Sequence, residues 1–209
     1  IAAVGNTGLV NAVIEKRVDS LQIDQLVVRE IRAHLVDLHH IELKKNIRLI
    51  GILGHDVYQD FEVFIDFQSK VIVLTRVNKK GFRIDTLAPF ELPYDSMSFD
   101  LQHHLIIIDT RVNNVRLKMI LDSGAELNLI DRQVNRKVMG KFTIIKRVNL
   151  LGVGNKEVEV LAGVMNEVQC GNQFSEKMNT LLTSLDEINQ SFDVNVQGVL
   201  GYEFLKKRR

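Results

Sequence analysis

The sequence predicts an all-β protein, mainly strands with short helices, built as closed β-barrel lobes. Two observations carry this prediction. Many short strand-like segments are separated by turn residues, with few helical patterns between them. The chain also contains an internal repeat, which implies two related lobes, the first of them incomplete.

Two pairs of short sequences define the repeat. "AVGN" begins at Ala3 and "GVGN" begins at Gly152, 149 positions later. "GILGHDVYQDF" begins at Gly51 and "GVLGYEFLKK" begins at Gly198, 147 positions later. Two landmarks in the same order with nearly the same spacing indicate a duplicated unit with a small insertion or deletion. Within this chain the first copy lacks its front half, and the second lacks a final strand.

Proline marks the boundary between the two copies. Pro89 and Pro93, the only prolines of the chain, lie in one short stretch. Proline removes a backbone donor and restricts the residue before it, which is typical of a linker or loop. We therefore expect residues 1–78 to be the C-terminal part of a first lobe, 79–100 a linker, and 101–209 a second lobe.

The individual elements follow from alternation of apolar residues and from turn chemistry. We expect a hairpin over 61–74 and two strands over 104–122 that are joined by a turn at Asn113-Asn114. A short helix or irregular turn is expected over 131–139. Two strands are expected over 155–170 with a break at Gly163, and a helical segment is expected to begin at Gly201.

Bulk composition excludes several classes of function. The formal net charge of +1 gives no electrostatic basis for binding nucleic acid, and no apolar run is long enough to span a membrane. A single cysteine, Cys170, excludes an intrachain disulfide and a multi-cysteine metal site. The paired histidines lack the carboxylate spacing of a metal site, so neither a metal nor a cofactor is expected. The sequence assigns no compartment.

The stretch "ILDSGAELNLI", residues 120–130, places Asp-Ser-Gly-Ala between two apolar runs. This pattern resembles the active-site loop of aspartic peptidases, and the retroviral-type (retropepsin-like) members, including bacterial ones, are most similar. The resemblance continues at "LLGVGNKEV", residues 150–158, where such proteins have a glycine-rich flap. It continues again at "GVLGYEFL", residues 198–205, as an apolar–apolar–Gly element followed by a short helix. In the first copy, "AAVGNTG" and "GILGHDV" match the same two elements.

The resemblance implies an endopeptidase in which two carboxylates share one proton, because like charges about 3 Å apart cannot both ionise. Asp122 is then one catalytic carboxylate, Ser123 hydrogen-bonds across the pair, and Gly124 permits close approach of the backbone. The implied substrate-binding residues are Ala125, Gly152, Val153, Gly154 and Asn155. The expected partner is a peptide or protein substrate that pairs its main chain as an added strand.

The chain shows one Asp-Ser-Gly, whereas this mechanism needs two carboxylates. The position 149 residues before Asp122 falls upstream of Ile1. The second Asp is therefore expected from an upstream lobe, which the repeat favours, or from a homodimer partner. Two other functions stay open: a catalytically inactive module of the same fold that binds peptides or mediates assembly, and a structural β-domain with no peptide cleft.

Asp122 also has a purely local interpretation, since an acid at a strand end followed by Ser-Gly favours an Asx-turn. The apolar flanks and the repeat favour the catalytic interpretation. Asp66, Asp109 and Asp131 are expected to be solvated near strand ends.

Overall fold

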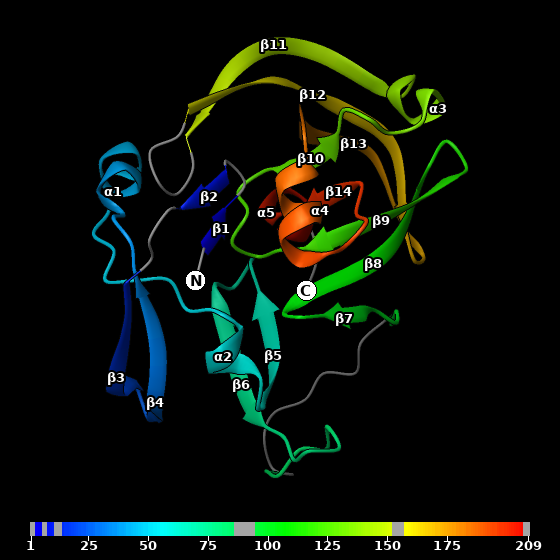
Figure 1. Ribbon diagram of the computed structural model, residues 1–209. Coiled ribbons are helices and arrows are strands. Elements are labelled where there is room, and N and C mark those ends of the chain that lie inside the picture. The colour runs from blue at the N-terminus through cyan, green and yellow to red at the C-terminus, as the bar shows by residue number, and fades with distance from the viewer. Residues whose placement is uncertain (1–2, 6–7, 11–13, 86–94, 152–156, 207–209) are drawn as a thin grey trace. The chain divides into compact units, whose positions relative to one another are not determined.

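The computed structural model describes residues 3–5, 8–10, 14–85, 95–151 and 157–206. The chain divides into two compact units (Figure 1). Unit 1 comprises Ile1–Phe64, Ile72–Pro89 and Leu151–Lys156, and unit 2 comprises Ile65–Val71, Phe90–Leu150 and Glu157–Arg209.

Unit 1 contains separate two-stranded ribbons and two short helices. Its elements are β1 (Ala3–Gly5), β2 (Gly8–Val10), β3 (Ile14–Ile23), β4 (Leu26–Leu35), α1 (His39–Lys45) and α2 (His55–Tyr58). β1 pairs with β2 and β3 pairs with β4, both antiparallel. β5 (Phe61–Asp66) and β6 (Val71–Arg76) form a further ribbon, which confirms the hairpin expected over 61–74; the tip of this ribbon, Ile65–Val71, belongs to unit 2.

Unit 2 is built on one eight-stranded sheet. Its elements are β7 (Asp100–Gln102), β8 (Leu105–Val112), β9 (Val115–Leu121), β10 (Asn128–Asp131), α3 (Arg136–Met139), β11 (Phe142–Leu151), β12 (Glu157–Cys170), β13 (Gln173–Thr183), α4 (Asp186–Phe192), β14 (Gly198–Leu200) and α5 (Tyr202–Leu205). The strand order is β11-β12-β13-β10-β14-β9-β8-β7, with a further pairing of β12 with β8. That pairing closes six strands into a ring, so the expected all-β fold with a closed barrel is confirmed.

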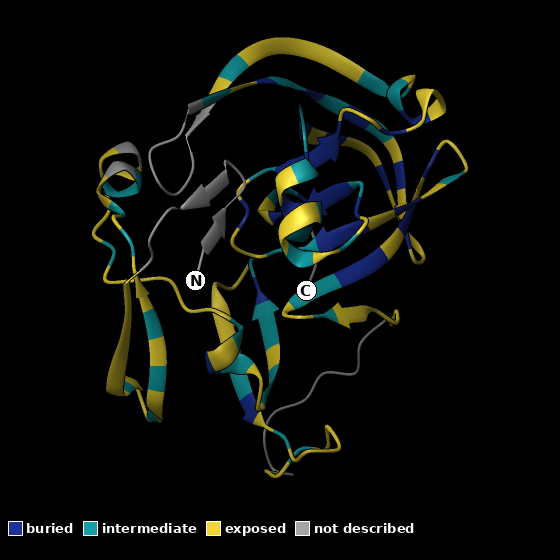
Figure 2. Cartoon of the chain, in the orientation of Figure 1, coloured by how far each residue is buried: buried dark blue, intermediate teal, exposed yellow. Residues whose placement is uncertain are grey.

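The core of unit 2 lies inside this ring. Ile130, Met165 and Leu200 belong to this core and are almost completely buried. Figure 2 shows that the buried residues gather in unit 2, whereas the β3–β4 ribbon is exposed or half-buried along its length. Burying such side chains contributes roughly 1.5–3 kcal/mol each, so the barrel is the part of the chain that packing stabilises most.

The hairpin of β8 and β9 forms as turn chemistry predicts. Val112 pairs with Val115, which leaves Asn113 and Asn114 as a two-residue loop. Both asparagines have positive φ, 50° and 60°. Asparagine tolerates this backbone region, and the resulting type I′ geometry matches the twist of the flanking strands.

The break expected at Gly163 was wrong. β12 runs without interruption from Glu157 to Cys170. A Cβ at Gly163 would meet the carbonyl oxygen of Thr143 and the ring of Phe142, both on the next strand of the sheet. The glycine therefore permits close approach of β11 instead of ending the strand.

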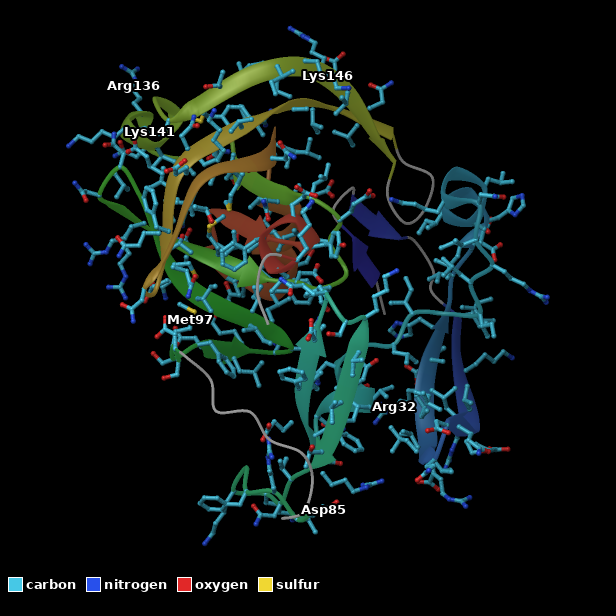
Figure 3. The ribbon with its side chains drawn as sticks, turned by 180° about the vertical axis from the view of Figure 1, so that it is seen from behind. Arg32, Asp85, Met97, Arg136, Lys141 and Lys146 are labelled. Carbon is cyan, nitrogen blue, oxygen red and sulfur yellow. The ribbon has the colours of Figure 1, made fainter. Side chains whose placement is uncertain are left out.

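Charged side chains lie on the outer surface of the barrel. Arg136 on α3 and Lys146 on β11 extend outward (Figure 3). Lys141 Nζ forms an ion pair with Glu167 across the surface at 2.6 Å. Among the described helices, none has the length and apolar character needed to cross a membrane.

Candidate active site

The Asp122 loop connects β9 to β10 and is fixed at both ends by backbone hydrogen bonds. Asp122 N–H donates to the carbonyl oxygen of Leu200 at 3.0 Å. The carbonyl oxygen of Ala125 accepts from Tyr202 N–H at 2.7 Å. Because Leu200 and Tyr202 flank Gly201, the loop is held by the glycine element of the second copy.

The Asp122 side chain is half-buried, and Ser123 and Gly124 are exposed. Gly124 N–H donates to Asp122 Oδ1 at 2.8 Å. This contact fixes the direction in which the carboxylate points. It is also the hydrogen bond of an Asx-turn, so the local and the catalytic interpretations share it. They differ in whether a second carboxylate faces Asp122.

Two glycines bring the backbone close to the loop. A Cβ at Gly201 would lie 2.5 Å from the carbonyl oxygen of Ala125 and 2.8 Å from that of Leu127. A Cβ at Gly198 would lie 2.8 Å from the carbonyl oxygen of Leu129 and would also meet Met119. A larger residue at Gly201 would displace the loop, and one at Gly198 would displace β9 and β10 from β14, so these glycines set the position of the loop and of the strands beside it.

Asn128 holds the loop in place and was missed by sequence reasoning. Its side chain is fully buried, with 0% exposure. Oδ1 accepts from Gly201 N–H at 2.9 Å, and Nδ2 donates to the carbonyl oxygen of Asn179 at 3.0 Å. Its sequence signal was a lone amide inside the apolar run "LNLI", since buried polar groups need hydrogen-bond partners.

The expectation that Asp66 and Asp131 are solvated was wrong, because each is only 6% exposed. Asp131 accepts from Gln133 N–H at 2.7 Å and from Leu185 N–H at 3.1 Å. Asp66 accepts from the backbone N–H groups of Gln68 and Ser69 at 2.9 and 3.0 Å. Each carboxylate is buried because it satisfies backbone donors.

Asp109 is exposed, as expected, and forms an ion pair with Arg116 on the neighbouring strand. The hydrogen bond from Arg116 lowers the pKa of Asp109. In unit 1, the hydrogen bond from Arg83 likewise lowers the pKa of Glu62. Both shifts come from ion pairs outside the Asp122 loop.

The structure brings together four of the predicted site residues. Asp122, Ser123, Gly124 and Ala125 form one anchored turn. The flap residues predicted to bind substrate, Gly152, Val153, Gly154 and Asn155, lie outside the described residues. Within the described part of the chain, no second carboxylate is in hydrogen-bond or ion-pair contact with Asp122, and no group of three His, Cys, Asp or Glu side chains is placed to hold a metal ion.

Comparison with known proteins gives a family match over the second half of the chain. Residues 108–204 match the sequence model of a family described as aspartyl protease. Among solved structures, the chain is similar to a retropepsin-like aspartic protease from Rickettsia conorii, with 17% identity over 50% of this chain and 71% of that chain and a TM-score of 0.35. It is also similar to the retroviral protease-like domain of Ddi1 from Leishmania major, with 13% identity over 49% of this chain and 76% of that chain and a TM-score of 0.34. No curated protein matches.

Proposed function

Because residues 108–204 match the sequence model of the aspartyl protease family, we propose that unit 2 is one half of an aspartic endopeptidase and that Asp122 is one of its two catalytic carboxylates. The single observation that carries this proposal is the anchored loop. Asp122 sits at the end of β9 in a turn whose backbone is held by Leu200 and Tyr202. A fixed carboxylate is what positioned acid–base catalysis requires.

The chemistry is hydrolysis by general acid and general base. The ionised carboxylate of the pair takes a proton from a water molecule, which attacks the carbonyl carbon of the substrate peptide bond. The protonated carboxylate donates to the carbonyl oxygen. Collapse of the tetrahedral intermediate breaks the C–N bond: the carboxyl that took the proton from water gives it to the leaving nitrogen, and the other carboxylate takes back the proton of the former carbonyl oxygen. The two titrations belong to the pair, because neither carboxylate ionises independently of the other.

Ser123 and Gly124 support the carboxylate in this proposal. The Gly124 N–H keeps Asp122 Oδ1 oriented at 2.8 Å. The exposed Ser123 hydroxyl is available to hydrogen-bond across the pair to the second loop. Ala125 and the segment 152–155 would contact the substrate chain, which pairs as an added strand.

One observation favours a second candidate function. In the described residues Asp122 contacts no other carboxylate, and a single carboxylate cannot run the proton-sharing mechanism. A peptide-binding or assembly module of the same fold would use the barrel without hydrolysis. The two candidates differ in whether bound peptide is cleaved.

The substitution Asp122→Asn tests the proposal. It keeps an oxygen to accept from Gly124 N–H but removes the ionisable group, so the fold is retained and the cleavage rate falls by about 10²–10⁴-fold. The measurement is cleavage of a denatured protein substrate between acidic and neutral pH. Asp109→Asn is the matched control, because Asp109 is an exposed carboxylate of the same unit, and it leaves the rate unchanged.

Equal cleavage by the wild-type and Asp122→Asn chains removes Asp122 from the mechanism. Peptide binding by the wild-type chain with no cleavage at any pH supports the non-catalytic candidate instead.

A further inference from the structure

Residues 14–58 of unit 1 repeat the paired strands and the two helices of residues 161–205 of unit 2, except that no strand forms at 51–53, where unit 2 has β14. The ribbon of β3 and β4 corresponds to 161–170 and 173–182 of β12 and β13, at a constant offset of 147 residues. Ile14 pairs with Leu35, and the residues 147 positions later, Leu161 and Leu182, pair with each other. α1 corresponds to α4, and α2 corresponds to α5, at the same offset.

Local hydrogen bonds repeat as well. Asn46 follows α1 and Asp193 follows α4, and both residues have left-handed backbone conformations, with φ of 51° and 48°. Leu49 N–H donates to Glu42 Oε1 at 2.6 Å. At the same offset, Val196 N–H donates to the side-chain oxygen of Asn189 at 2.9 Å. The two segments therefore share one folded arrangement, beyond the short sequence matches.

In unit 2 the repeated segment is covered by residues 105–131. β14 pairs with β9 and β10, and β13 pairs with β10. Val199 and Leu200 are consequently 1% and 0% exposed. Met165, on β12, is 2% exposed.

In unit 1 the matching side chains are open to solvent. Ile52 and Leu53, which correspond to Val199 and Leu200, are 65% and 41% exposed. Val18, which corresponds to Met165, is 36% exposed. A Cβ added at Gly51 or Gly54 would meet no described atom within 4 Å, in contrast to Gly198 and Gly201. We call Val18, Gly51, Ile52, Leu53 and Gly54 the open face.

We propose that the open face binds a strand–turn–strand segment built like residues 105–131, which ends in an apolar–Asp–Ser/Thr–Gly loop. The occupant is a segment other than residues 105–131 themselves, because these already cover 161–205. The inference that the Asp of the docked segment supplies the second catalytic carboxylate rests on the proposed function. The docking itself rests on the geometry of the repeat.

The unit 2 contacts define how the segment docks. The carbonyl oxygen of Leu53 would accept from the docked Asp N–H, as that of Leu200 accepts from Asp122. His55 N–H would donate to a docked carbonyl, as Tyr202 donates to Ala125. Gly54 would lie close to the backbone of the docked segment, as Gly201 lies close to the backbone of Ala125. This contact would explain why position 54 is a glycine although no described neighbour leaves too little room for a side chain.

The test is binding of a labelled synthetic peptide with the sequence of residues 105–131 to the 209-residue chain, followed by fluorescence anisotropy. Gly54→Val and Ile52→Asp are each expected to weaken binding at least about tenfold, the effect of losing about 1.4 kcal/mol at an interface. Gly54→Val has room in the free chain, so its folding is unaffected. Ile144→Asp is the matched control, since Ile144 is 55% exposed in unit 2, and it leaves binding unchanged.

Three results overturn the docking proposal. The first is no binding of the peptide, and the second is equal binding by all variants, which would indicate strand exchange in unit 2. The third is a dimer, seen by light scattering of the wild-type chain, that Ile52→Asp dissociates, because a second copy of the chain would then occupy the open face. A peptide with Asn at the position of Asp122 is expected to bind equally well. If the peptide binds to the open face but no substrate is cleaved, the proposed function is rejected and the docking inference stands. If a substrate is cleaved in a way that depends on Asp122 but the peptide does not bind, the docking inference is rejected and the proposed function stands.

Discussion

At the scale of single residues, Asn128 is the side chain on which the position of the candidate catalytic loop most depends. It is fully buried and joins β10 to Gly201 and to β13. An amide in this place satisfies one backbone donor and one backbone acceptor that would otherwise be buried without partners. Among the described residues, the Asp122 side chain hydrogen-bonds only to Gly124 N–H, so the position of Asp122 depends on neighbours such as Asn128.

Asn128→Ala is therefore expected to lower the free energy of unfolding by about 1–3 kcal/mol, because Gly201 N–H and the Asn179 carbonyl lose their partner. Urea unfolding followed by circular dichroism measures this change. Asn172→Ala is the control, since Asn172 is exposed and hydrogen-bonds to Asp95 at the surface, and it changes stability by less than about 0.5 kcal/mol. Equal effects of the two substitutions would contradict the role assigned to Asn128.

At the scale of elements, local chemistry was predictable and long-range packing was not. The Asn113-Asn114 turn and the helix after Gly201 follow from residues adjacent in sequence, and the structure confirms both. The role of Gly163 was mistaken because the same residue signals a break or a close approach, and only the neighbouring strand decides between them. Asp131 was assigned to solvent because its partner, Leu185, lies far away in sequence.

The residues of the candidate site that are contiguous in sequence were predictable, whereas the long-range contacts that hold them were not. Asp122, Ser123 and Gly124 form a contiguous motif, so sequence found them together, and the family match over 108–204 confirms the resemblance. The hydrogen bonds that Gly201 N–H donates to Asn128 and that Tyr202 N–H donates to Ala125 join segments more than 70 residues apart, and no local pattern encodes them. The flap and the second carboxylate remain predictions.

The two glycine elements give a matched comparison of the same residue in two surroundings. Gly201→Ala is expected to destabilise unit 2 by about 1–3 kcal/mol, because its Cβ would lie 2.5 Å from the Ala125 carbonyl oxygen. Gly54→Ala is expected to be neutral or to stabilise by up to about 1 kcal/mol, since its φ of −100° suits alanine and the space is open. Thermal unfolding of both variants measures the difference. Similar losses would show that Gly54 is already packed.

At the scale of the whole molecule, the chain holds one covered segment and one uncovered copy of it. Residues 161–205 form a barrel only together with 105–131, which supply the central strands. Residues 14–58 have the matching two long strands and two helices in the same order but no strand at the position of β14, and β3 and β4 pair only with each other among the described residues. The same local structure therefore exists with and without its complement, and the two copies should differ in how firmly they are held.

Hydrogen exchange tests this difference directly. β12 and β13 bond to neighbours on both sides, so their amides are protected by the barrel, whereas in the described residues β3 and β4 are bonded on one side only. Mass spectrometry of residues 14–35 and 161–182 is expected to show exchange at least about a hundredfold slower in the second segment, equivalent to about 2.7 kcal/mol. Adding the peptide of residues 105–131 should slow exchange in 14–35. Equal protection of the two ribbons before the peptide is added would mean that unit 1 already holds its own complement.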